Sequence, residues 1–139
     1  MNNFTKRILL GGTLGALAGV ACAYGAATHG VPGAFSISSP MFWTIVLNRF
    51  TLGSIIGIVG IFVVHPIFNR IKLGPVLRGL DIGIWVSLLM ATGILIGGQA
   101  DRWAGFWYTL IAGAIIGVAI DYIITKRYGQ GKQLLDYQS

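Results

Sequence analysis

The residues best suited to chemistry in this sequence are a few ionisable side chains at the ends of long apolar runs. His65, Asp81 and Asp121 each lie near such an end, and Arg78 lies three residues before Asp81. Ionisable groups inside a membrane are costly and often mark ion or proton pathways. A layer in which two carboxylates and an imidazole exchange protons would suit an oligomeric channel or transporter.

The same residues also suit a polar boundary layer without transport, and we prefer this interpretation. Each lies within about two helical turns of a basic flank, so its charge can reach the headgroups or pair locally. Asp81 can pair with Arg78, and His65 precedes Pro66 in a pattern typical of helix ends.

Arg49 lies within the second apolar run, where its depth has two interpretations. If the helix begins near Phe42, Arg49 is about two turns inside it. If the spanning core begins at Phe50, Arg49 marks the outer boundary, and we prefer this second case. In either case we expect Asp101, which lies in the third loop on the outer side, to form an outer ion pair with Arg49.

Other patterns that would indicate catalysis or ligand binding are absent from the sequence. It has one cysteine, Cys22, and two histidines far apart, so it offers no metal-ligand spacing and no intrachain disulfide. Glutamate does not occur, there is no GxSxG sequence, and the glycine pairs lie in apolar runs rather than in a phosphate-binding loop. We therefore expect no catalytic residue, no metal and no cofactor, and predict that the protein is not an enzyme.

Four apolar runs must position the polar residues. They cover about residues 8–27, 42–68, 79–98 and 103–124. Runs of about 20 residues cross a hydrocarbon core of about 30 Å, and in lipid the backbone must satisfy its hydrogen bonds within each segment. We predict an all-α, polytopic membrane protein, in which residues 1–139 form one four-transmembrane-helix bundle with short loops and a polar tail, 128–139.

The composition agrees with lipid as the solvent. Hydrophobic residues make up 55% of the chain and charged residues 10%, whereas soluble domains have about a quarter of their residues charged. The net charge of +6 comes from short basic clusters beside the apolar runs, not from one continuous basic face. We therefore expect a lipid bilayer as partner and no nucleic acid.

The basic clusters also predict an orientation. The first loop, 28–40, has no Lys or Arg, and the third has only Arg102, beside Asp101. Positive flanks stay cytoplasmic, so both termini are predicted to be cytoplasmic, in the plasma (inner) membrane. The basic flanks are Lys6 and Arg7, then Arg70, Lys72 and Arg78, then Lys126, Arg127 and Lys132.

The first apolar run also resembles a signal peptide, because it follows a basic head and contains Ala21-Cys22-Ala23. A lipoprotein signal is excluded, since Gly19 stands where a leucine is expected. We expect the run to be retained as the first spanning helix.

Glycines spaced four residues apart recur in every run. Residues at this spacing share one helix face, and small side chains there let two helices approach closely in lipid. We predict a packing strip on each helix, without deciding whether its partner is in the same chain or in another copy. The strips are Gly11, Gly15 and Gly19; Gly53 and Gly57; Gly79, Gly83 and Ser87, then Gly93 and Gly97; and Gly113 and Gly117.

These features favour a small non-catalytic helical bundle that is a subunit or scaffold of a membrane assembly. The expected partners are other membrane subunits or further copies of the chain. The alternative is an oligomeric small channel or transporter that uses the polar layer of His65, Asp81 and Asp121.

Overall fold

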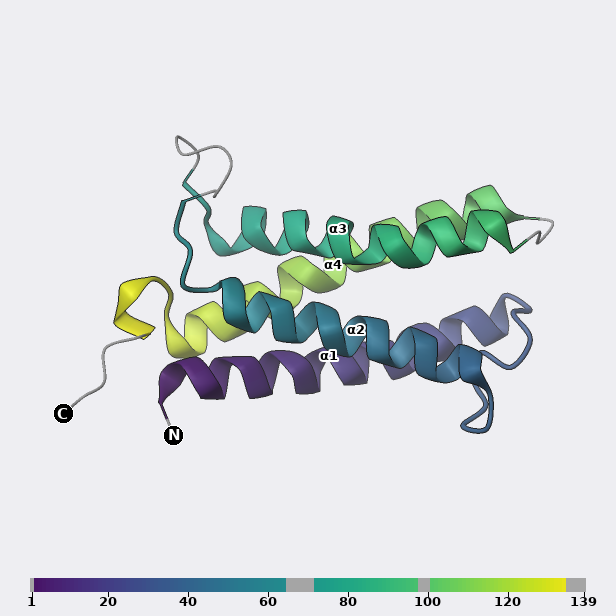
Figure 1. The fold of residues 1–139 in the computed structure, drawn as a ribbon, viewed down its shortest axis with the longest axis horizontal. Coiled ribbons are helices and arrows are strands. Elements are labelled where there is room, and N and C mark those ends of the chain that lie inside the picture. Colours follow the sequence, from purple (N-terminus) through teal and green to yellow (C-terminus); the bar gives the residue numbers. More distant parts are fainter. Residues whose placement is uncertain (1, 65–71, 98–100, 135–139) are drawn as a thin grey trace.

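The computed structural model describes residues 2–64, 72–97 and 101–134. In these residues the chain forms four α-helices and one short 3-10 turn (Figure 1). The helices pair as two hairpins, α1 with α2 and α3 with α4, and the two hairpins lie side by side. The elements are α1 (Asn3–Thr28), α2 (Pro40–Val59), α3 (Pro75–Ile96), α4 (Arg102–Tyr128) and η1 (Lys132–Leu134).

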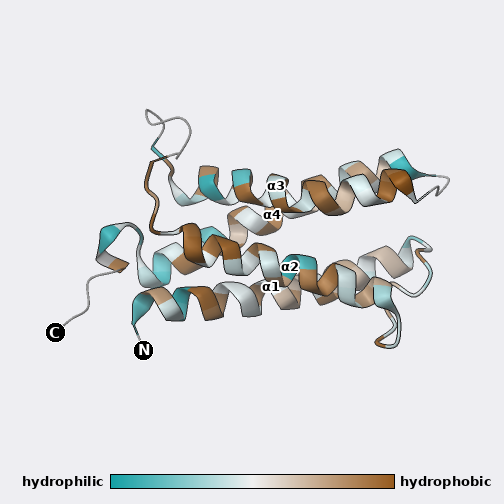
Figure 2. Ribbon diagram, in the orientation of Figure 1, coloured by the Kyte–Doolittle hydropathy of each residue, from teal (hydrophilic) through white to brown (hydrophobic). Residues whose placement is uncertain are grey.

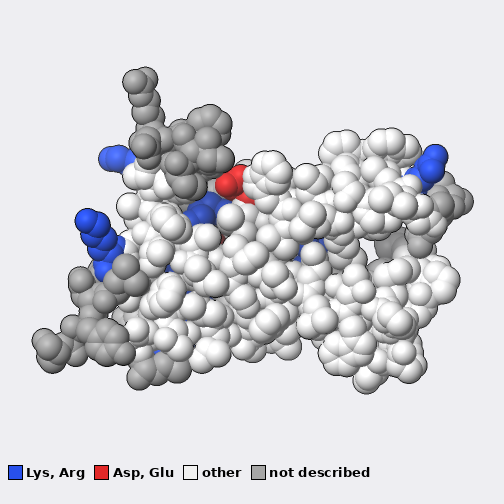
Figure 3. Space-filling view, viewed as in Figure 1, with Lys and Arg blue, Asp and Glu red and all other residues white. Residues whose placement is uncertain are grey.

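All four helices are long and apolar enough to cross a membrane. Hydrophobic residues recur along all four helices, with hydrophilic residues between them at a few positions (Figure 2). The protruding basic side chains lie toward the two ends of the bundle, and the face between them is mostly uncharged, with one acidic patch and a few basic atoms visible (Figure 3). These are the properties of an all-helical integral membrane protein.

Three helices extend beyond their predicted ranges, and α3 does so by beginning at Pro75 rather than at residue 79. Helix α1 begins at Asn3, earlier than residue 8, because the side-chain oxygen of Asn2 accepts a hydrogen bond from the Thr5 amide at 2.8 Å and caps the first turn. Helix α4 continues to Tyr128 and ends where Gly129 takes a positive φ of 79°.

Helix α2 is shorter than predicted. The sequence suggested a helix over 42–68, but α2 ends at Val59, and residues 65–68 lie outside the described part of the chain. The Gly57 carbonyl accepts a hydrogen bond from the Arg7 side chain at 3.2 Å, and a Cβ at Gly60 would overlap the same guanidinium. The end of α2 therefore forms around a buried arginine, which the apolar pattern of the sequence does not reveal.

Glycines bring α1 and α2 into backbone contact. A Cβ on Gly11 would overlap the carbonyl oxygen of Gly53, and a Cβ on Gly53 would overlap that of Gly11. A Cβ on Gly19 would lie 2.7 Å from the Cα of Val46, and one on Gly57 would lie 2.6 Å from the Cα of Ile8. Only glycine at these positions allows the two helices to lie this close.

The second hairpin is built in the same way. A Cβ on Gly83 would overlap the Gly113 carbonyl oxygen, and a Cβ on Gly117 would overlap that of Gly79. Ser87 continues the strip one turn after Gly83, and its hydroxyl lies against Gly113. The glycine strips thus join helices within one chain.

Contacts between the two hairpins are fewer than those within each hairpin. They include an apolar cluster in which Leu52 and Ile56 of α2 meet Ile120 and Ile124 of α4. Apolar side chains gain little free energy by moving from lipid into such a cluster, because lipid tails are as apolar as the side chains of the cluster. The pairing of the hairpins must therefore depend on more than this cluster.

We expect Gly83→Ala to lower the free energy of unfolding by about 1–3 kcal/mol, because the new methyl group overlaps the α4 backbone. Gly93→Ala is the matched control on the same helix, since its Cβ meets nothing within 4 Å. That change should be neutral or stabilising by up to about 1 kcal/mol, because alanine favours helix. Unfolding of the purified protein in mixed micelles measures both, and equal effects would contradict the packing described here.

Candidate functional site

Three ionised side chains meet inside the end of the bundle where α1 begins and α4 ends. Arg7 of α1 and Asp121 of α4 are 0% exposed, and Arg78 of α3 is 1% exposed. Thr125, one turn after Asp121, completes the group. We call these four residues the arginine clamp, because two guanidinium groups enclose one carboxylate.

The Asp121 carboxylate receives four hydrogen bonds. Its Oδ1 accepts from Arg7 Nη2 at 2.6 Å, from Arg78 Nη2 at 2.9 Å and from the Thr125 hydroxyl at 3.0 Å. Its Oδ2 accepts from Arg78 Nε at 2.7 Å. Arg78 thus grips both oxygens with two neighbouring nitrogens, the fork geometry that lysine cannot reproduce.

Arg78 uses all five of its N–H donors. Besides its bonds to the carboxylate, it donates to Thr125 Oγ1 at 3.0 Å, to the Phe62 carbonyl at 2.9 Å and to Gln130 Oε1 at 3.2 Å. The guanidinium therefore joins the start of α3 to α4 and to the segments that follow α2 and α4. A buried arginine with every donor satisfied keeps its charge away from lipid.

Arg7 makes a similar set of bonds from the first hairpin. It donates to the Gly57 carbonyl at 3.2 Å, to the Gly129 carbonyl at 2.7 Å and to Thr125 Oγ1 at 2.9 Å, in addition to Asp121. Helices α1, α2 and α4 are thereby joined through one side chain. Thr125 accepts from both arginines and donates to Asp121, so its hydroxyl is also fully used.

The clamp is suited to bracing rather than to carrying ions. Two arginines and one aspartate leave one positive charge in excess, which opposes entry of a cation. The carboxylate is 0% exposed and each oxygen accepts from an arginine, Oδ1 three bonds in all and Oδ2 one, so its charge is already compensated by guanidinium groups. Among the described residues, no group of three or more His, Cys, Asp or Glu side chains could hold a metal ion.

The other residues of the predicted polar layer are not placed in the clamp. His65 lies outside the described residues. Asp81 is half-buried on α3 and is not without a partner, while Lys126 is exposed near the end of α4. The structure therefore brings together Arg78 and Asp121 from the predicted layer and adds Arg7, which the sequence presented as a basic flank.

Arg49 lies in the middle of α2, not at its boundary. It is the tenth residue of a 20-residue helix and is 2% exposed. Its Nη1 donates to the Ser87 hydroxyl at 2.5 Å and its Nη2 to the Thr109 carbonyl at 3.2 Å. The preferred sequence interpretation, a core that begins at Phe50, is wrong because α2 ends at Val59 and leaves too few residues to span a bilayer.

The expected outer ion pair between Arg49 and Asp101 is not formed. Asp101 is exposed at the start of α4, whereas Arg49 is buried at the middle of α2. Arg49 contacts α4 at Thr109, which lies about two helical turns after Asp101. Burial by three helices, which the sequence does not show, separates the two residues.

A regularity in the sequence could have revealed the buried charges. Arg7 stands four residues before Gly11, and Arg49 stands four residues before Gly53. Asp121 stands four residues after Gly117. Each of these three charges therefore continues the glycine strip of its own helix and shares the strip's buried face.

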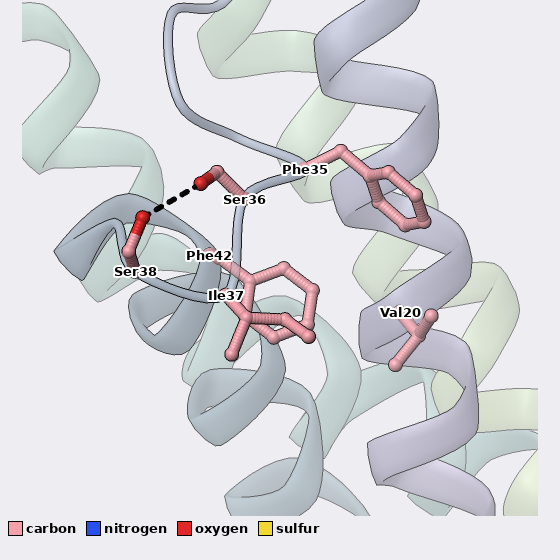
Figure 4. A pocket seen from close by; sticks show the side chains of 6 residues that line it. All are labelled: Val20, Phe35, Ser36, Ile37, Ser38 and Phe42. Atoms are coloured by element: carbon pink, nitrogen blue, oxygen red, sulfur yellow. Dashed lines mark hydrogen bonds between the residues drawn. The ribbon is translucent and has the colours of Figure 1, made fainter.

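An open pocket at the other end of the bundle has no such chemistry. The loop between α1 and α2 contributes Phe35, Ser36, Ile37 and Ser38, which lie near Val20 of α1 and Phe42 of α2 (Figure 4). The Ser36 and Ser38 hydroxyls hydrogen-bond to each other at 3.0 Å. The lining has no titratable side chain, so it offers no acid, base or metal ligand.

A group of exposed aromatic residues lies at this same end. Trp43 lies in the first turn of α2, Trp103, Trp107 and Tyr108 lie in the first two turns of α4, and all four are exposed. Such rings suit the interface between lipid and water.

Comparison with protein-family models, with curated proteins and with solved structures finds no match for this chain. The role of the clamp therefore has to be argued from its own geometry.

We expect Asp121→Asn to destabilise the protein by about 3–5 kcal/mol, because it leaves two buried guanidinium groups without a carboxylate. Asp101→Asn is the matched control at an exposed carboxylate and should change stability by less than about 0.5 kcal/mol. Arg78→Lys should also destabilise, because lysine keeps the charge but loses the two-point grip on Asp121. Thermal unfolding in micelles tests all three, and a stable Asp121→Asn variant would show that the clamp is unimportant for folding.

Proposed function

We propose that this chain is a small non-catalytic integral membrane protein that acts as a helical-bundle subunit or scaffold of a membrane assembly. The observation that carries the proposal is the saturation of Asp121. The Asp121 carboxylate accepts four hydrogen bonds inside the described bundle and joins helices to one another. Among the described residues it does not face an ion pathway or a substrate site. A rigid bundle of this kind presents its outer surface to partners.

An apolar depression between α3 and α4 supports a partner on this surface. It is lined only by apolar side chains, those of Leu80 of α3 and of Ala114, Ile115, Val118 and Ala119 of α4. Small side chains among larger ones let a neighbouring helix approach closely in lipid. We propose that a transmembrane helix of another subunit packs here.

The proposed orientation puts both termini in the cytoplasm of a cell bounded by a plasma (inner) membrane. The start of α1 and the end of α4 lie at one end of the bundle (Figure 1). Lys72, Lys126, Arg127 and Lys132 are exposed near this end. At the opposite end Arg102 is balanced by Asp101, so the excess of positive charge supports the cytoplasmic assignment.

The second candidate is an oligomeric channel or transporter, and a different observation favours it. Buried ionised side chains cost free energy in a membrane and are common along transport routes. Asp81, half-buried on α3, and Asp121 would both belong to such a route. The double variant Asp81→Asn and Asp121→Asn should then abolish flux in proteoliposomes, whereas a scaffold role predicts no flux in the wild type at all.

The scaffold proposal is tested by purifying the protein in mild detergent and identifying what remains bound. A stoichiometric second protein is expected, and Ala119→Trp should reduce its recovery about tenfold or more by obstructing the depression. Leu17→Trp, an exposed position on α1, is the matched control and should leave recovery unchanged. A pure homo-oligomer with ion flux would favour the second candidate and overturn the first.

A further inference from the structure

Arg49 is a buried cation whose described partners are all neutral. Its side chain donates to the Ser87 hydroxyl and to the Thr109 carbonyl, and its Nε has no hydrogen-bond partner. Within the described residues, the ion pairs of buried arginines are those of Arg7 and Arg78 with Asp121. Arg49 therefore differs from Arg78, whose five donors are all used and whose charge faces a carboxylate.

The position of Arg49 makes this arrangement costly. Helix α2 spans about 30 Å with its 20 residues, and Arg49 is its tenth, so the charge lies near the middle of a span. An ion moved from water to such a site loses several kcal/mol of solvation unless a counter-ion restores it. The described interior holds Arg7, Arg49 and Arg78 against Asp121 alone, which leaves two positive charges in excess.

The other described carboxylates are poorly placed to balance Arg49. Asp101 is exposed at the start of α4. Asp81 precedes Ser87 by six residues on α3, which is about 9 Å along the helix axis, and it has a partner of its own. A counter-charge at Arg49 is therefore expected to come from solution.

We propose that the bundle binds a small monovalent inorganic anion, of the halide or nitrate class, at Arg49 between α2, α3 and α4. Two of the donors left for it are on different side chains. The Arg49 Nε–H is unpaired, and the Ser87 hydroxyl accepts from Arg49, which leaves its own proton to donate. Each Nη atom uses one of its two N–H groups on a neutral acceptor, so the guanidinium keeps N–H groups for a ligand. A compact, singly charged ion is the anion that costs least to desolvate at this enclosed, mid-span position.

The surroundings of Ser87 and Asn48 fit this assignment. A Cβ on Gly113 would overlap the Ser87 oxygen, so glycine is what admits the hydroxyl between α3 and α4. Asn48 donates to the Val86 carbonyl at 3.3 Å, while its buried Oδ1 has no partner. A buried acceptor with no donor is a place for a water, so we expect an ordered water at Asn48 Oδ1.

This inference does not rest on the scaffold role, and anion-dependent stability tests it. The thermal unfolding midpoint of the purified protein is measured at fixed pH and ionic strength while sodium gluconate is replaced by sodium chloride, bromide or nitrate. We expect the midpoint to rise with the concentration of the small anion and to saturate, because a ligand that binds only the folded state stabilises it. An identical midpoint in chloride and gluconate would overturn the proposal.

Variants assign the effect to the site. Arg49→Gln should abolish the anion dependence, and Arg102→Gln, at an exposed arginine, should retain it. Ser87→Ala keeps the guanidinium but removes one donor, and should weaken the apparent affinity about tenfold, which remains measurable if Arg49→Gln does not fold. Anion dependence that persists in either site variant at wild-type affinity would contradict the assignment.

Direct observation completes the test. Crystals grown in bromide should show anomalous scattering beside Arg49 Nε. Bromide only at the arginine clamp or at the surface, or a water alone at Arg49, would overturn the proposal.

Discussion

The fold depends on the grip that two arginines of different hairpins have on Asp121. Within lipid, apolar contact does not distinguish one neighbouring helix from another, so it cannot by itself decide how two hairpins pair. The clamp can, because Arg7 of the first hairpin and Arg78 of the second share one carboxylate. Any shift of one hairpin along the other would separate a buried charge from its partner, which is far more costly than a change of apolar contacts.

Glycine and charge therefore have separate tasks in this molecule. Reciprocal contacts such as that of Gly11 with Gly53 bring the backbones of one hairpin together. The clamp and the Arg49–Ser87 bond then fix one hairpin against the other at two levels. Between these levels lie Leu52 and Ile56, which fill the interface without specifying it.

The sequence predicted the parts of this fold that depend on local pattern. The number of spanning helices follows from the apolar runs. Each run is long enough to cross a bilayer, and the chain has only 10% charged residues. The end of α2 was missed because it depends on Arg7, a residue far away in the chain. A long apolar run continues past Val59, and nothing within it shows that an arginine of another helix bonds to the Gly57 carbonyl and lies against Gly60.

The candidate site was harder to predict, because a basic flank and a buried arginine look alike in sequence. Arg7 follows Lys6, and this pair has the usual form of a charged flank. Lys6 is half-buried while Arg7 is fully enclosed, a difference set by which side of α1 faces the second hairpin. Arg7 lies four residues before Gly11 and therefore on the same face of α1 as the glycine strip. The position of a charge relative to a glycine strip is thus more informative than its position beside an apolar run.

The excess of buried positive charge limits what this bundle can do. An interior with three guanidinium groups and one carboxylate raises the electrostatic potential between the hairpins, and low dielectric surroundings screen it weakly. Such a positive potential attracts anions and opposes the passage of cations and protons. Cations and protons are the ions that a layer of carboxylates would conduct. The balance of buried charges therefore argues for a braced bundle with an affinity for anions, and a cation pathway would require carboxylates that its described interior does not supply.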